Sequence, residues 1–382
     1  MSASPLADAL EAKRVILCVG SGGVGKTTTA AALAVEAARR GRRTAVLTVD
    51  PAPRLKDALG LGTLDGKPRR VPLGGVGARG AHLDAFLLDV KRTFDELVLA
   101  LASTQDQARR VLENRLYQNL SSTLAGTAEY MAVERVYRLA EEGGYDLLVV
   151  DTPPARHAVD FLDAPRRLAN LLDSRAFAIL KDPTSILPAA GSRVAHFLLA
   201  SVLRGLERFT GIGLVREVSE FMGVIESLTA ALRTRVGAVG DLLRGPGTMP
   251  LLVTAPEPRL VYETEVLVKG LAGIGLTAGG IVVNRALPRA LFGSTAGDPG
   301  LPDGASGALA TRLRRAYTDL RLLAARQEAT LAPLVAAAGA PVVAEVPLLP
   351  MDPGSLSDLA LVARYLFPDP TGETSPASEL GC

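Results

Sequence analysis

The chain has 382 residues, with 42 basic and 40 acidic side chains and a net charge of +2. A charge this small gives no general attraction to nucleic acid or to a membrane surface. Two cysteines are too few for a disulfide scaffold or a multi-cysteine metal site. With no signal peptide and no uncharged apolar run of about 18 residues, the sequence predicts a soluble, cytoplasmic protein without a membrane span.

A phosphate-binding motif stands near the N-terminus. The apolar run 15–19 predicts a buried strand, and the alanine-rich segment 30–40 predicts a helix. Between them, residues 20–27 (GSGGVGKT) fit G-x-x-x-x-G-K-[ST]. In such a loop backbone N–H groups meet phosphate oxygens, a lysine reaches the β- and γ-phosphates and a hydroxyl binds Mg²⁺. The predicted nucleotide-binding residues here are Gly20, Ser21, Gly22, Gly23, Val24, Gly25, Lys26, Thr27 and Thr28.

Acidic residues follow two further predicted strands. The strand 44–49 (TAVLTV) ends before Asp50, and the proline after it places Asp50 and Asp57 on a loop at the carboxyl edge of the sheet. The strand 145–150 (YDLLVV) ends at Asp151, the position that the Mg²⁺ side of a P-loop NTPase requires. A loop cap or a surface charge is the alternative for each carboxylate.

A long helical block interrupts the strand–helix alternation. It follows an exposed connection at 60–80 and a strand candidate at 83–90, and the α/β pattern resumes after it. The later elements are expected at 250–255, 260–271, 280–283, 308–338, 341–346 and 356–366. The pattern predicts an α/β fold with one doubly wound, mostly parallel sheet and a helical insertion.

This organisation predicts a single domain over residues 1–367. Its core comprises 14–90, 143–160 and 246–367, and its helical subdomain comprises about 91–142 and 160–245. Residues 288–310 are expected to form a mobile loop and 368–382 a disordered tail. Within the helical block, 197–209 and 218–232 are amphipathic. Their faces either pack together or line a groove for a hydrophobic client protein.

Five motifs occur in an order that resembles one family. After the P-loop come D-P-A-x-x-L-x-D at 50–57, D-T-x-P at 151–154, T-A-P-E-P at 254–258 and V-V-N-R at 282–285. The chain resembles the ArsA/GET-type ATPases, the arsenite-pump and tail-anchored-protein-targeting branch of the dimeric P-loop NTPases with a deviant Walker A motif. The likeness spans about 14–367. It implies ATP and Mg²⁺ as ligands, and a homodimer or a heterodimer with a paralogue.

The resemblance also implies roles for individual residues. Asp57 would orient or activate the attacking water, and Asp151 would hold Mg²⁺ together with Thr27 and Asp50. Asn284 would recognise adenine. The prolines Pro347 and Pro350 would flank the base, and Glu257 and Arg285 complete the implied nucleotide-binding set.

The chain departs from the family at one important position. Family members usually carry a lysine directly after the first P-loop glycine, and it reaches into the partner subunit's site; here this residue is Ser21. Three outcomes are open: a slow homodimer, compensation by Arg54 or Arg156 in the loops corresponding to switch I and switch II, or pairing with a lysine-bearing paralogue. Both arginines are therefore catalytic candidates beside Lys26 and Asp57.

We expect an ATPase in which nucleotide-driven opening and closing of a dimer moves the helical subdomain and handles a client or partner. One alternative is a regulatory ATP-binding subunit of a heterodimer, because Ser21 stands where family members usually carry the lysine. Another is a metalloid-pump subunit, but Cys18 and Cys382 are too few for a thiolate site that binds As(III). A partition-type ATPase acting on DNA or a membrane would need a basic patch or an amphipathic terminal helix, and the sequence shows neither.

Overall fold

The structure is a computed structural model. It describes residues 5–52, 54–73, 81–114, 117–118, 127–174, 212–287, 292, 300 and 306–368, and for 127 and 212–227 it describes the backbone alone. The amphipathic stretch 197–209 lies outside the described residues. So do most of the predicted loop 288–310 and nearly all of the predicted tail 368–382.

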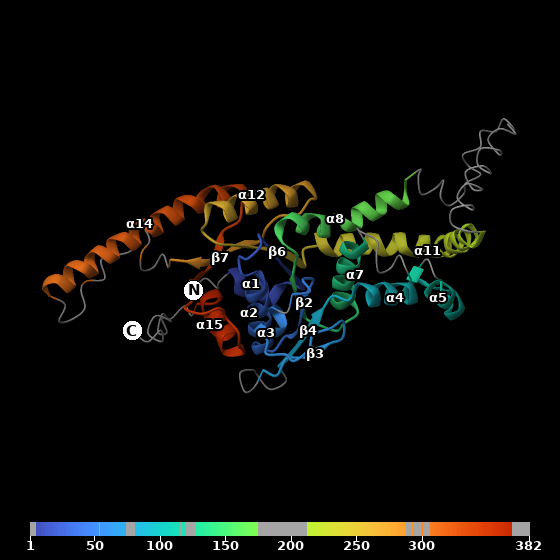
Figure 1. Cartoon of the computed structure of the whole chain (residues 1–382), viewed down its shortest axis with the longest axis horizontal. Coiled ribbons are helices and arrows are strands. Elements are labelled where there is room, and N and C mark those ends of the chain that lie inside the picture. Colours follow the sequence, from blue (N-terminus) through green and yellow to red (C-terminus); the bar gives the residue numbers. More distant parts are fainter. Residues whose placement is uncertain are drawn as a thin grey trace, which may run out of the picture. The chain divides into compact units, whose positions relative to one another are not determined.

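An eight-stranded sheet forms the core of the α/β part of the chain (Figure 1). Its strand order is β3-β4-β2-β5-β1-β6-β7-β8, and every neighbouring pair is parallel except β3 with β4. The strands are β1 (Val15–Val19), β2 (Arg43–Thr48), β3 (Arg69–Arg70), β4 (His82–Leu87), β5 (Leu147–Asp151), β6 (Thr248–Thr254), β7 (Gly280–Ala286) and β8 (Val342–Pro347).

Helices cover both faces of this sheet. Val253 of β6 belongs to the same buried cluster as Leu33 of α2 (Lys26–Arg39) and Leu359 of α15 (Leu356–Leu366). The next residue, Thr254, points to the other face, where its Oγ1 lies 3.2 Å from Oγ1 of Thr264 in α12 (Pro258–Gly273). The predicted doubly wound α/β fold is confirmed. The structure also describes α1 (Pro5–Ala12), α3 (Arg54–Ala58) and α14 (Gly307–Ala338) in this part.

Strand β1 lies between β5 and β6, and the chain leaves it toward both sides of the sheet. From β1 the chain continues to β2 on the β5 side, and after β5 it crosses to β6 on the other side. In open α/β sheets such a reversal creates a crevice at the carboxyl ends of the strands, where ligands bind. The loop after β1 therefore stands where a ligand is expected.

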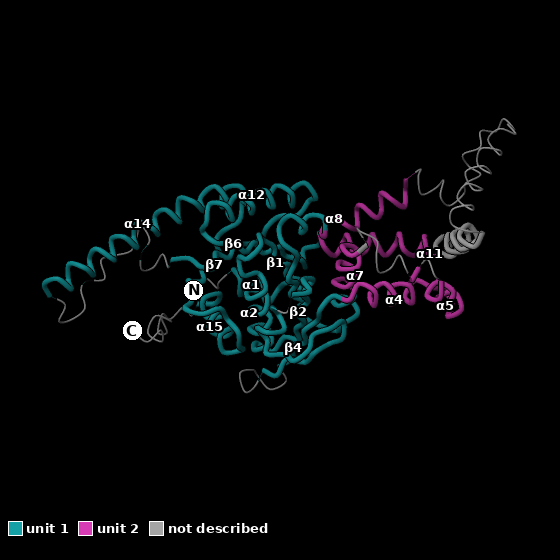
Figure 2. The backbone as a smooth tube through the Cα atoms, viewed as in Figure 1, with its two compact units in different colours: residues 1–88, 138–160, 244–382 teal, residues 89–137, 161–243 magenta. Residues whose placement is uncertain are grey.

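The chain divides into two compact units (Figure 2). Unit 1 comprises residues 1–88, 138–160 and 244–382 and contains the sheet, and unit 2 comprises 89–137 and 161–243. Unit 2 is built from α4 (Val90–Leu101), α5 (Gln105–Leu112) and most of α7 (Thr127–Glu141), α8 (Ala155–Leu172) and α11 (Ile212–Arg244).

Unit 2 has an apolar core of its own. Leu228, on the amphipathic stretch 218–232, packs with Val98 and Val111 of the same unit. Buried charges are paired there too: Arg235 Nε of α11 lies 3.0 Å from Oε1 of Glu134, whose side chain is fully buried. At Leu228 the predicted apolar face is thus used for packing within the unit.

Two predicted elements differ from the structure. The strand candidate 83–90 is wrong at its end, because β4 stops at Leu87 and α4 begins at Val90. The reason is Asp89, whose carboxylate accepts a hydrogen bond from the backbone N–H of Arg92 at 2.9 Å and so caps α4. The predicted connection 60–80 also contains the short strand β3, which pairs with β4.

Candidate active site

The loop between β1 and α2 is packed so closely that two of its glycines cannot be replaced. A Cβ on Gly20 would lie 2.0 Å from the backbone oxygen of Val253. Gly25 has a φ of 92°, and a Cβ there would lie 2.2 Å from Nδ2 of Asn284. The loop is thus pressed against the ends of β6 and β7, and its position is determined by the sheet.

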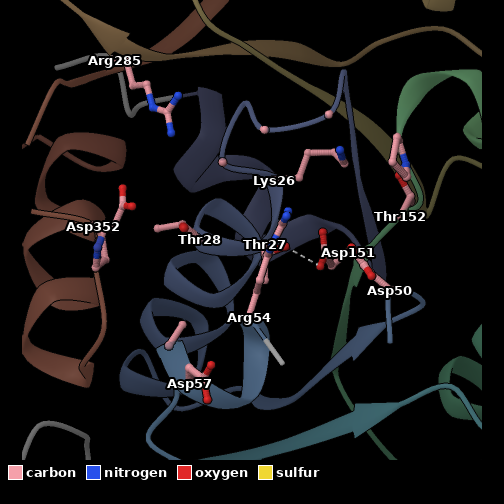
Figure 3. Close-up of a pocket in the computed structure, with 16 residues that line it drawn as sticks. Lys26, Thr27, Thr28, Asp50, Arg54, Asp57, Asp151, Thr152, Arg285 and Asp352 are labelled. Carbon is pink, nitrogen blue, oxygen red and sulfur yellow. Dashed lines mark hydrogen bonds between the residues drawn. The ribbon is translucent and has the colours of Figure 1, made fainter. Parts of the chain in front are cut away.

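A cleft of about 460 Å³ opens beside this loop (Figure 3). It is lined by Gly22, Gly23, Gly25, Lys26, Thr27, Thr28, Asp50, Arg54, Asp57, Ala58, Asp151, Thr152, Pro154, Arg285, Asp352 and Pro353. The segments after β1, β2, β5 and β8 and the carboxyl end of β7 therefore meet at one edge of the sheet, as parallel strands allow. Of the predicted site residues, Gly20, Ser21, Val24, Arg156, Glu257, Asn284, Pro347 and Pro350 are not part of this lining.

Lys26 is a buried cation at one end of the cleft. Its side chain is largely covered, and its Nζ donates a hydrogen bond to the backbone oxygen of Ser21 at 2.8 Å. Burial lowers the pKa of Lys26, and the nearby carboxylate of Asp151 opposes this shift. The ammonium group is thus held in place at the loop, next to where phosphate oxygens would bind.

Asp151 is buried at the end of β5. Its carboxylate accepts hydrogen bonds from the hydroxyls of Thr27 at 2.7 Å and Thr48 at 3.0 Å. Burial raises the pKa of Asp151, while these two hydrogen bonds act in the opposite direction. Thr27 and Asp151 are 124 residues apart in sequence, and the parallel pairing of β1 with β5 brings them together.

The oxygen atoms at this end of the cleft fit a hard divalent cation. They come from Thr27, Asp151 and Asp50, and Mg²⁺ prefers oxygen ligands. Among the described residues no group of three or more His, Cys, Asp or Glu side chains could hold a metal alone. Mg²⁺ at such a site would use one or two carboxylates and complete its shell with water and phosphate.

The segment after β2 brings charged residues of both signs to the cleft. Asp50 accepts a hydrogen bond from the backbone N–H of Ala52 at 3.0 Å, which forms a tight turn. Arg54 and Asp57 follow on α3, so the prediction that Asp57 lies on a loop is wrong. Asp57 remains accessible, with 63% of its side chain exposed, and Lys56 lies 3.6 Å from its carboxylate.

Ser21 faces away from the cleft. Its side chain is fully buried, and its hydroxyl donates to the backbone oxygen of Leu260 at 3.3 Å and lies 3.5 Å from Oγ1 of Thr264. Only its backbone carbonyl serves the site, by accepting the hydrogen bond from Lys26. The side chain at this position therefore contacts α12 rather than the cleft.

The far end of the cleft is the part in which the observed lining residues differ most from the predicted ones. Arg285 lines it and has a φ of 56°, a left-handed conformation that is uncommon for a residue other than glycine. Asn284 lies behind the loop and donates from Nδ2 to the backbone oxygen of Val24 at 2.9 Å. The segment after β8 contributes Asp352 and Pro353, not the predicted prolines.

Asp352 is the main lining residue that sequence reasoning missed. It belongs to no recognised motif, and its only signal is its place shortly after a strand that ends at the same edge. Two predicted residues lie elsewhere: Glu257 directly precedes α12, and Arg156 is exposed in the first turn of α8.

Comparison with known proteins identifies the family of this chain. The model of one protein family, described as the anion-transporting ATPases of ArsA type, matches residues 13–292. The chain belongs to the ArsA ATPase family. The resemblance inferred from the five motifs is thus confirmed, and with it the membership of the P-loop ATPases.

Individual relatives come from distant organisms. The chain is 32% identical over 279 residues to an uncharacterised protein of Streptomyces coelicolor, covering 72% of this chain and 63% of that protein. It is 28% identical to the ATPase get3 of Aspergillus terreus (72% and 73% covered) and 26% identical to the ATPase ASNA1 homolog 2 of Paramecium tetraurelia (70% and 74% covered). The chain thus spans less than two thirds of the Streptomyces protein. Among the helices that the structure describes, none is long and apolar enough to cross a membrane.

Proposed function

We propose that this chain binds ATP with Mg²⁺ in the cleft and hydrolyses it to ADP and phosphate. The observation that carries the proposal is the hydrogen bond between Thr27 and Asp151 beside the buried ammonium of Lys26. A P-loop hydroxyl, a strand-end carboxylate and a lysine in one cleft are the groups with which P-loop NTPases hold a triphosphate. The family and the names of the relatives support the same activity.

Each group at the phosphate end has a chemical task. The backbone N–H groups of residues 22–27 and the ammonium of Lys26 bind the β- and γ-phosphate oxygens. Thr27, Asp151 and Asp50 are the residues that would hold Mg²⁺. When bound there, Mg²⁺ neutralises charge on the phosphate oxygens.

Asp57 is the proposed water-orienting residue. Its exposed carboxylate lines the cleft on α3 and can accept a hydrogen bond from a water molecule. That water attacks the γ-phosphorus while the bond to the oxygen bridging the β- and γ-phosphorus breaks. The proton that the water loses passes to the phosphate that forms, and ADP leaves.

The nucleoside is proposed to occupy the end of the cleft formed by Arg285, Asp352 and Pro353. Asn284 is the proposed adenine-recognising residue, as the family resemblance implies. Its amide also supports the P-loop through Val24, so it would link base recognition to phosphate binding. Glu257, Pro347 and Pro350 are proposed to border the nucleotide when it is bound.

The output of the cycle is proposed to be a movement of unit 2 in a dimer that handles a client protein. Helix α8 begins four residues after Asp151 and continues from unit 1 into unit 2, so a change at the strand end can be transmitted along one helix. The buried side chain of Ser21 favours one second candidate, a regulatory subunit that binds ATP but turns it over slowly.

The test is to measure phosphate release, ATP affinity and molecular size of the purified protein, with and without Mg²⁺-ATP.

Lys26→Ala should remove ATP binding, because the ammonium group of Lys26 is proposed to contact the phosphates. Asp57→Asn should keep binding and lower turnover by about 10²–10⁴-fold, the usual cost of losing a positioned acid–base group. Turnover of Asp57→Asn at the parent rate would show that another group orients the water. A parent protein that binds ATP without turnover would favour the regulatory alternative.

A further inference from the structure

The cleft contains a second cation near Lys26. Arg54 is the first residue of α3, is exposed and lines the same cleft as Lys26 and Thr27. Figure 3 shows Lys26, Thr27 and Arg54 together among the residues that line the cleft. The positive charge of Arg54 contributes to the lowered pKa of Lys26, which agrees with their proximity.

The Arg54 side chain has no partner among the described residues. Its neighbour Lys56 pairs with Asp57 at 3.6 Å, and Lys26 donates to the Ser21 carbonyl. Arg54 makes no ion pair or side-chain hydrogen bond with any residue that the structure describes. A guanidinium group left free inside a polar cleft is available to an anionic ligand.

The charges of the lining explain why a triphosphate would need this cation. Four carboxylates line the cleft, at Asp50, Asp57, Asp151 and Asp352, and three cations, at Lys26, Arg54 and Arg285. Arg285 lies at the far end, away from Asp151 (Figure 3). Without Arg54, Lys26 would be the only cationic side chain among the lining residues at the phosphate end, beside three carboxylates.

The structure also distinguishes the two candidate arginines, because only Arg54 lines the cleft and Arg156 does not. Arg156 is exposed in the first turn of α8 and does not line the cleft. Ser21 cannot supply a polar side chain either, because its hydroxyl is buried against Leu260 and Thr264. Among these three residues, only Arg54 presents a positive charge inside the cleft.

We propose that Arg54 is a catalytic residue that acts within its own subunit, where its guanidinium stabilises the negative charge of the phosphoryl group during transfer. The proposal rests on ATP hydrolysis in this cleft. An arginine supplied to a phosphoryl-transfer site can be worth about 10³–10⁵ in rate, whether it comes from the same chain or from a partner. Arg54 thereby replaces a charge that would otherwise come from a second subunit.

The first test separates turnover from binding. Arg54→Ala should lower kcat by at least about 10²-fold and change the affinity for a non-hydrolysable ATP analogue much less, because the charge develops in the transition state. Arg54→Lys should retain part of the rate, and added guanidinium ion should raise the rate of Arg54→Ala. The control is Arg39→Ala, which removes an arginine from the surface ion pair with Glu36 and should leave turnover unchanged.

The outcomes distinguish this proposal from the one it rests on. No turnover by the parent protein would overturn ATP hydrolysis itself. Turnover by the parent with an equal rate for Arg54→Ala would overturn the role of Arg54 alone. Loss of the rate in Arg156→Ala, with Arg54→Ala at the parent rate, would assign the charge to Arg156 instead.

A second test asks whether Arg54 acts in its own subunit. Lys26→Ala and Arg54→Ala chains carrying different tags are co-expressed, and complexes that contain both are purified. If Arg54 acts within its own chain, neither site in such a complex is complete, and turnover stays at the level of Arg54→Ala. Recovery toward half of the parent rate would show that Arg54 serves the partner's site. If the two chains form no complex, Arg54 has no partner site to serve.

Discussion

At the scale of single residues, the site is built from charges that folding alone would not favour. Asp151 is almost completely buried, and Lys26 is largely buried close by. Burial raises the pKa of Asp151 and lowers the pKa of Lys26, so the folded protein disfavours the charged form of each. These are the forms that the proposed binding of Mg²⁺ and phosphate requires, so the proposal implies that stability is given up for function.

We predict that Asp151→Asn stabilises the protein more strongly at neutral than at acid pH. Because the folded-state pKa of Asp151 is raised above its ordinary 3.8, its contribution to stability falls as pH rises from 3.8 through the folded-state pKa. Asparagine has no charge to bury, so its advantage should grow over this range and then level off. Urea unfolding of both proteins between about pH 4 and 8 measures the difference. A difference that is constant with pH would mean that burial does not disfavour this carboxylate.

At the scale of elements, the P-loop depends on strands that are distant in sequence. Gly25 has left-handed backbone geometry, and Asn284 of β7 fills the space where a side chain would be. The same asparagine donates to the oxygen of Val24. The loop is thus supported from behind by β7, while Gly22 and Gly23 have free space around them.

Gly25→Ala should destabilise the protein and remove ATP binding. The left-handed conformation costs about 1–2 kcal/mol for a residue with a Cβ, and the contact of 2.2 Å with Asn284 adds to this. Combining it with Asn284→Ala should recover the steric part and leave the conformational part. Gly62→Ala is the matched control, because a Cβ there meets nothing within 4 Å and should change the free energy of unfolding by less than about 0.5 kcal/mol. If the single and the double variant unfold alike, Asn284 is not the obstacle.

At the scale of the whole molecule, the family name suggests anion transport, whereas the cysteine content argues against a site for metalloids. The matching family model describes anion-transporting ATPases. This chain contains two cysteines; Cys18 is fully buried in β1, and Cys382 lies outside the described residues. Burial raises the pKa of the Cys18 thiol, which disfavours the thiolate that a soft metalloid needs.

Arsenite and antimonite should therefore not stimulate ATP turnover. Two cysteines cannot form a three-thiolate site, and one of them is inaccessible. The measurement is phosphate release with and without each metalloid, with Cys18→Ser and Cys382→Ser as controls. If a metalloid stimulates the parent protein and this stimulation disappears in either variant, the result would contradict this expectation and support the metalloid-pump alternative.

Much of the fold was predictable because its signals are local. The strand–loop–helix around the P-loop, the aspartate at the end of β5 and the helix Leu356–Leu366 each depend on residues that are adjacent in sequence. Apolar runs, glycines and strand-ending prolines act over a few residues, so a sequence pattern captures them. The boundary between β4 and α4 was misplaced because the cap formed by Asp89 outweighs the apolar pattern there.

The sequence by itself thus determined that this is a P-loop ATPase of the ArsA family and which segments carry its charges. Only the tertiary structure decided that the side chain of Ser21 faces α12, that Asp352 joins the cleft, and that Arg54 lines the cleft while Arg156 does not. These facts depend on which strand lies beside which and on the direction of each side chain at the strand ends. Such relations connect residues far apart in the sequence, as with Ser21 and Leu260, which are 239 positions apart, and no local pattern encodes them.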